Sequence, residues 1–159
     1  MSYISKNRKY VYLIILVLWI SFIFFMSSKP AVESSKDSAV FVNLIMKAVK
    51  ISGDKIDIVT TIIRKGGHFS EYFILSIISF VTLKKFAAGK ERVFSSALLL
   101  CVSVALCDEF LQGFIDGRSS EVRDVIIDYS GALMFFILYN IGLKISAVKS
   151  RSEKKRLVE

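Results

Sequence analysis

Residues 10–27 read YVYLIILVLWISFIFFMS, an unbroken apolar run without a charged side chain. At about 1.5 Å per residue, a helix of this length covers most of a bilayer core roughly 30 Å thick. Lys6, Arg8 and Lys9 precede the run and would suit the basic head of a secretory signal. The apolar stretch is longer than a signal core and no small-x-small cleavage site follows it, so we predict an uncleaved anchor.

The rest of the chain also has the composition of a membrane protein. Its 53% hydrophobic content and mean hydropathy of +0.54 are too high for an ordinary soluble domain of 159 residues. Three further apolar runs, at residues 68–83, 93–114 and 124–143, are long enough to cross a bilayer. The sequence therefore predicts an all-α membrane protein, a single domain over residues 1–159 with four transmembrane helices.

The longest segment outside these spans lies between the first and the second. It opens with the only proline, Pro30. Apolar residues then recur at helical spacing through residues 40–49 with polar residues between them, which predicts an amphipathic helix too short and too charged to cross. Residues 52–54 (Ser-Gly-Asp) break this pattern, and residues 56–63 form a second short amphipathic piece. Residues 115–123 are predicted to be a tight hairpin between the third and fourth spans.

The distribution of basic residues predicts the orientation. Three precede residues 10–27, four lie between the second and third spans, and six follow the fourth span. With four spans these segments share one side, which the positive-inside rule places in the cytoplasm. Both termini are thus predicted to be cytoplasmic, with the amphipathic segment and the hairpin outside. The net charge of +8 sits in short runs beside apolar stretches, which indicates topology rather than nucleic-acid binding.

Ionisable residues gather at the outer end of the predicted bundle. Each costs at least about 2.5–3.5 kcal/mol at the centre of a span, so each needs a partner or a water-filled cavity. The second span contributes three polar residues at its start: His68, Glu71 and Tyr72. The third and fourth contribute Asp108, Glu109, Gln112, Asp124 and Asp128. Basic residues outside the spans are available to neutralise these carboxylates: Arg64, Lys65, Arg118 and Arg123.

Two interpretations stay open for His68 and Glu71 at the start of the second span. His68 and Glu71 are three residues apart and share a helix face, so they fit a pair at a helix start, where the carboxylate favours the positive dipole end. They equally fit a role in binding or proton transfer.

The acidic residues of the third and fourth spans also have a structural and a functional interpretation. Asp108 and Glu109, with Gln112, fit a buried hydrogen-bond network, but carboxylates at a helix C-terminus oppose the dipole, which favours a site. Asp124 fits a helix cap, whereas Asp128 lies one turn deeper and caps nothing. Gly131, in the fourth span, is predicted to allow a neighbouring helix to pack closely against that span.

The motif RKGGHFSEY at residues 64–72 is followed by DEFLQ at 108–112, GRS at 117–119, and DVIID at 124–128 with Gly131. In this order and spacing, covering about half of the chain, the motifs resemble the VanZ-like family. The resemblance implies a four-helix domain in the bacterial plasma membrane. The family's named member is associated with resistance to the lipoglycopeptide teicoplanin, without an agreed biochemical mechanism. Family members often have proline before the Gly-Arg pair, where this chain has Asp116.

Two functional hypotheses follow. The first is a non-catalytic protein that binds a lipid-linked or lipoglycopeptide ligand in the outer leaflet, with membrane lipids as partners. Its candidate binding residues are Arg64, Lys65, Glu71, Tyr72, Asp108, Gln112, Arg118, Asp124 and Asp128. The second is a membrane-embedded enzyme that modifies a lipid or lipid-linked substrate.

For the enzyme, His68 and Glu109 are the candidate general acid and base, and Arg118 the clamp for an anionic group. A divalent cation would be held by Asp108, Asp124 and Asp128. The strong catalytic signatures GxSxG and HExxH are absent, so the sequence favours binding and leaves catalysis, cofactor, metal and oligomeric state open.

Three spatial predictions remain. The three spans that carry ionisable residues are expected to form the functional bundle, with residues 10–27 and the amphipathic segment packed around them. The side chain of Arg118 is expected to reach Glu109, Asp108 or Asp124, because the loop that holds it is short. Cys101 and Cys107 are six residues apart and face different directions on a helix, so no disulfide joins them.

Overall fold

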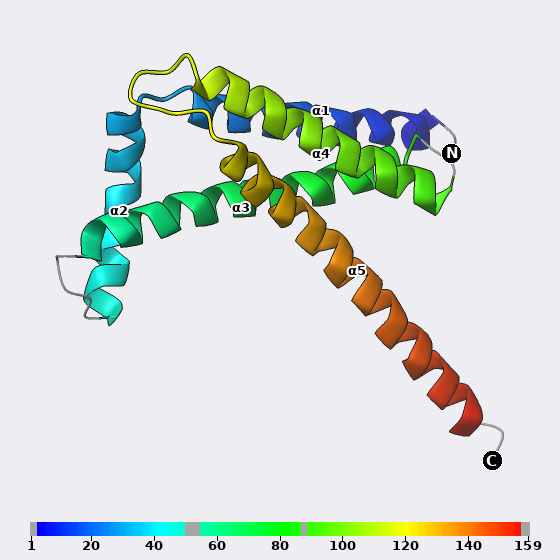
Figure 1. Cartoon of the computed structure of the whole chain (residues 1–159). Coiled ribbons are helices and arrows are strands. Elements are labelled where there is room, and N and C mark those ends of the chain that lie inside the picture. The colour runs from blue at the N-terminus through cyan, green and yellow to red at the C-terminus, as the bar shows by residue number, and fades with distance from the viewer. Residues whose placement is uncertain (1–2, 50–54, 87–88, 157–159) are drawn as a thin grey trace.

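The computed structural model describes residues 3–49, 55–86 and 89–156, which form five α-helices (Figure 1). They are α1 (Tyr3–Ser27), α2 (Ala31–Val49), α3 (Ile56–Leu83), α4 (Lys90–Gln112) and α5 (Val122–Arg156). All except α2 are long and apolar enough to cross a membrane. The described residues contain no strand. The predicted all-α fold with four spans is confirmed.

The helices alternate in direction around α3. In Figure 1, α1 and α4 run side by side toward the same end, while α3 and α5 run away from that end. The helix α2 stands across the bundle where α1 stops and α3 begins, and the C-terminal half of α5 extends away from the other helices. Each of the other four helices packs against α3. A side chain on α3 can therefore meet residues from every other element.

Two apolar clusters hold the bundle together. One surrounds Tyr72 and Leu75 of α3 and includes Ile23, Cys101 and Ala132 from the other three spans. The second lies further along α3, where the ring of Phe80 packs edge-on against Phe136. Most remaining apolar side chains on the four spans are exposed, as a lipid-facing surface requires.

The helices α3 and α5 approach each other closely at Gly131. A Cβ atom built there would lie 2.2 Å from the backbone oxygen of Phe69, so only glycine allows the two backbones to approach this far. The expected packing role of Gly131 is confirmed. This contact fixes the position of α5 next to the stretch of α3 that contains His68.

The largest differences from the predicted helix boundaries are in three places. Residues 56–63 are the first turns of the spanning helix α3 rather than a separate amphipathic piece, and Gly66 and Gly67 lie inside it. Packing of α2 against α3 offsets the roughly 1 kcal/mol that each internal glycine costs. The amphipathic helix already begins at Ala31, and α5 continues past residue 143 to Arg156 because its basic tail is rich in good helix formers. The predicted break at residues 52–54 lies outside the described residues.

Cys101 and Cys107 are both free, as expected.

Candidate functional site

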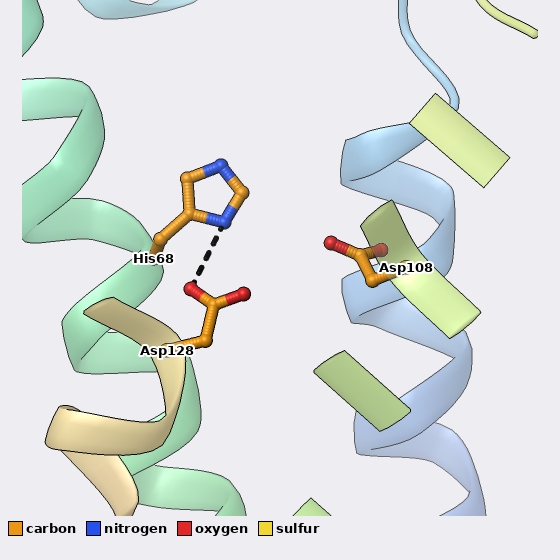
Figure 2. Close-up of side chains that lie close together, drawn as sticks. All are labelled: His68, Asp108 and Asp128. Atoms are coloured by element: carbon orange, nitrogen blue, oxygen red, sulfur yellow. Dashed lines mark ion pairs between the residues drawn. The ribbon is translucent and has the colours of Figure 1, made fainter. Parts of the chain in front are cut away.

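The only histidine of the chain pairs with a carboxylate from another helix. Because α3 begins at Ile56, His68 lies more than three turns inside the helix, and the helix-start interpretation of His68 and Glu71 is wrong. The His68 Nδ1 atom lies 3.5 Å from an Oδ1 of Asp128 on α5 (Figure 2). The Asp128 side chain is fully buried, and neither of its oxygens accepts a hydrogen bond from a described residue.

A second buried carboxylate points at this pair from α4. In Figure 2, the Asp108 side chain lies across from His68 and Asp128 and is directed toward them. Its Oδ2 accepts hydrogen bonds from Ser27 Oγ at 2.8 Å and from Gln112 Nε2 at 3.0 Å. Its Oδ1 is buried without a hydrogen-bond partner among the described residues. Asp108, Asp128 and His68 thus place one nitrogen and two oxygens within 4.8 Å of one another.

The guanidinium of Arg118 fastens the end of α1 to the end of α4. Its Nε donates to the carbonyl of Lys29 at 3.0 Å, its Nη2 to that of Met26 at 3.5 Å, and its Nη1 to Gln112 Oε1 at 3.1 Å. A cation is favourable at α1's C-terminal end, where carbonyls lack helical partners.

Arg118 is also linked to the buried carboxylates, but not in the way the sequence suggested. It forms no ion pair with Glu109, Asp108 or Asp124 within the described part of the chain, and reaches Asp108 through Gln112. The predicted direct pairing is therefore wrong. Burial lowers the pKa of Arg118 and Arg64 acts in the same direction, while Asp108 raises it. An arginine nevertheless stays protonated in a protein.

Glu109 serves the loop rather than the histidine. Its side chain is buried, and its Oε2 accepts a hydrogen bond from the backbone N–H of Glu121 at 2.8 Å. Consecutive residues on an α-helix point about 100° apart, so Asp108 and Glu109 cannot both face the same partner. The predicted acid–base pair of His68 and Glu109 is replaced by His68 and Asp128.

Asp124 is engaged by a lysine at the entrance to α5. Its carboxylate forms an ion pair with Lys65 of α3, and both side chains are partly exposed. The set of Asp108, Asp124 and Asp128 proposed from the sequence to hold a cation does not come together. His68 occupies the third place in the group, because Asp124 lies one turn nearer the helix end than Asp128.

A cavity of about 220 Å³ opens beside His68. His68 and Glu71 line it from α3, together with Arg64, and Arg118 lines it from the loop. Tyr72 does not: it is buried in the apolar cluster, and its hydroxyl has no hydrogen-bond partner among the described residues.

Sequence reasoning missed the contribution of the first two helices. The residues of α1 and α2 in the cavity wall are Met26, Ser27, Ser34, Ser38 and Phe41. Ser34 and Ser38 are four residues apart, a spacing that places both on one helix face and was the available signal. Trp19 of α1 also donates its indole N–H to the carbonyl of Glu71 at 3.1 Å. Residues 10–27 and the amphipathic helix pack against α3, as expected, and they also line the cavity, which the sequence did not predict.

The family model described as VanZ/LLP1 matches residues 12–143. The comparisons with curated proteins and with solved structures found no match.

Proposed function

The chain belongs to the VanZ/LLP1 family, and on that premise we propose that it binds the anionic head group of a membrane amphiphile in the cavity at the end of its bundle. The basic residues of the termini and of the segment between α3 and α4 favour the cytoplasmic side, so this cavity faces the outer leaflet. The protein accordingly acts at the outer face of a bacterial plasma membrane.

The observation that carries this proposal is the meeting of two guanidinium groups with apolar walls in one cavity. Arg118 is held in place by three hydrogen bonds, whereas Arg64 is exposed and forms no ion pair with any described residue. Guanidinium groups match the oxygens of phosphate and carboxylate in a planar, bidentate fashion. Phe41 and Ile63 supply the neighbouring apolar surface for the start of an acyl chain.

The size of the cavity selects the part of the ligand that enters. Pockets that enclose drug-sized molecules measure about 300–1,000 Å³, and this one is smaller, at about 220 Å³. A head group fits, while the acyl chains remain in the bilayer and the core of a glycopeptide stays outside. We therefore place any effect on teicoplanin in the handling of a lipid or lipid-linked ligand, and expression of the chain in a susceptible bacterium should raise the inhibitory concentration of teicoplanin.

Binding can be measured through Trp19, the only tryptophan. Its indole contacts the backbone of Glu71, which lines the cavity, so its fluorescence should change when the cavity fills. Purified protein is titrated with dihexanoyl phosphatidylglycerol and with the phosphatidylcholine of equal chain length. The anionic lipid should bind and the zwitterionic one should bind weakly.

Arg64→Gln should weaken binding of the anionic lipid about tenfold, the loss of one charge-assisted contact. Lys47→Gln is the matched control, because Lys47 is an exposed cation on α2 outside the cavity. Equal affinities for the two lipids, or equal effects of the two substitutions, would refute head-group binding at this cavity.

A second candidate is an enzyme that modifies the same head group by acid–base or metal-assisted chemistry. The specific observation in its favour is the buried pair of His68 and Asp128, whose carboxylate oxygens have no hydrogen-bond donor among the described residues. Incubation of the protein with outer-leaflet lipids, followed by mass spectrometry, tests for turnover. Asp128→Asn should abolish turnover, while Glu109→Gln, which alters the loop contact, should retain part of it. Absence of turnover in the wild type would contradict the enzyme and favour binding.

A further inference from the structure

Three helices each direct one metal-ligating side chain at a common point (Figure 2). We propose that His68, Asp108 and Asp128 bind a divalent transition-metal ion, with Zn²⁺ or Mn²⁺ as the class of ion that fits. The inference concerns the same cavity as the proposed head-group binding and deepens it, but the ligand residues differ from the arginines that carry that proposal.

The first argument is the charge of the buried carboxylates. Asp108 and Asp128 are fully buried, and three of their four oxygens have no hydrogen-bond donor among the described residues. The Nδ1 atom of His68 lies 3.5 Å from Asp128 Oδ1, and the imidazole forms a hydrogen bond with neither carboxylate. Buried polar groups are nearly always partnered, and isolated buried charges are costly. A divalent cation neutralises both carboxylates and gives the open oxygens a partner.

The second argument is the way Asp108 is held. Its Oδ2 accepts two hydrogen bonds, from Ser27 and Gln112, while its Oδ1 has no hydrogen-bond partner among the described residues. Arg118 in turn binds the amide oxygen of Gln112. Metal ligands are commonly oriented by such outer hydrogen bonds, which fix the carboxylate and leave one oxygen for the ion.

The third argument is distance. Ligands at about 2.1 Å around a tetrahedral ion lie about 3.4 Å apart, and His68 Nδ1 and Asp128 Oδ1 are already 3.5 Å apart. All three ligand atoms lie within 4.8 Å of one another, so a side-chain movement of at most about 1.4 Å closes the site. One imidazole and two carboxylates suit Zn²⁺ or Mn²⁺ better than Mg²⁺, which prefers oxygen ligands only. Three protein ligands leave at least one coordination position open, and one of them, His68, lines the cavity.

The test uses the full-length protein without an affinity tag, so that His68 is the only histidine present. After removal of metal with EDTA and dialysis, Zn²⁺ and Mn²⁺ are titrated in separate samples. Bound metal is measured by inductively coupled plasma mass spectrometry. We expect one ion per chain, not displaced by millimolar Mg²⁺. Bound Zn²⁺ should also protect His68 from modification by diethylpyrocarbonate.

Substitutions then assign the ligands. His68→Gln and Asp128→Asn should each weaken metal binding about 100-fold or more, since a direct ligand matters at least as much as an outer-shell partner. Asp124→Asn is the matched control, because it removes a neighbouring carboxylate that pairs with Lys65, and should change the affinity less than threefold. Absence of stoichiometric metal in the wild type, or equal losses in all three variants, would overturn the inference.

Thermal unfolding keeps the test decisive if a variant folds poorly. With a metal site, Zn²⁺ raises the unfolding temperature of the wild type and not of Asp128→Asn. At saturating Zn²⁺, a wild type no more stable than Asp128→Asn would contradict the proposal, because the substitution removes a buried charge that the metal should have compensated. The lipid titration is run with and without metal. Arg64-dependent lipid binding in a protein that binds no metal refutes only the metal site, and metal binding without lipid binding refutes only the proposed function.

Discussion

The close crossing of α3 and α5 offers the most direct test of how the fold builds the site. In Gly131→Ala, the new Cβ would lie 2.2 Å from the oxygen of Phe69, whereas ordinary contact begins at 3.4 Å. The obstacle is backbone, so it cannot rotate away. The two helices must separate by about 1.2 Å at this point.

The separation acts on the functional residues next to the crossing. His68 precedes Phe69 on α3, and Asp128 lies three residues before Gly131 on the same face of α5. The distance between His68 Nδ1 and Asp128 Oδ1 should therefore grow from 3.5 Å to about 4.7 Å. Overpacking of this kind costs about 1–3 kcal/mol in free energy of unfolding. We expect Gly131→Ala to lose stability and to bind Zn²⁺ at least about tenfold more weakly.

The assay is thermal unfolding in detergent followed by Trp19 fluorescence, together with the metal titration. Gly142→Ala on the same helix is the control, because a Cβ at that position meets no atom within 4 Å. There the substitution should be neutral or slightly stabilising, since alanine favours helix over glycine. An unfolding temperature for Gly131→Ala equal to or above that of Gly142→Ala, with unchanged metal affinity, would refute the reasoning.

Three further predictions follow from other contacts. Arg118→Ala should lower the free energy of unfolding by about 1.5–3 kcal/mol in chemical denaturation. Arg118→Lys should recover only part of this loss, because an ammonium cannot serve the three acceptors that the guanidinium reaches. Full recovery would show that charge alone matters. A double-mutant cycle of Lys65→Met and Asp124→Asn should give a coupling free energy of no more than about 1 kcal/mol, as expected for a partly exposed pair, and a larger value would mean the pair is buried in the membrane. In a cysteine-free background, Ser35→Cys should react with an impermeant maleimide in intact cells and Lys90→Cys only after permeabilisation; the reverse pattern would invert the orientation.

The sequence alone predicted the membrane-spanning fold, because hydropathy is a local property of a continuous stretch of chain. Residues 10–27 and three later apolar runs are long enough to cross a bilayer whatever their neighbours are, and the structure has the same four candidate spans. The gathering of polar residues toward one end of the spans was also visible, as was the need for glycine at residue 131. Some helix boundaries were not predicted: α3 continues through Gly66 and Gly67 and packs against α2.

Only the tertiary structure decided which polar side chains meet. Helical periodicity shows that Asp108 and Gln112 share one face of α4, but it does not say which face of α3 or α5 lies opposite. That choice depends on the rotation and crossing of the helices, which the approach at Gly131 and the apolar clusters determine. His68 consequently meets Asp128, 60 residues later in the chain, instead of Glu109. Ser27, from a span without a single charge, becomes a hydrogen-bond donor to Asp108 for the same reason: the pairing of helix faces is set by the whole bundle and by no single segment.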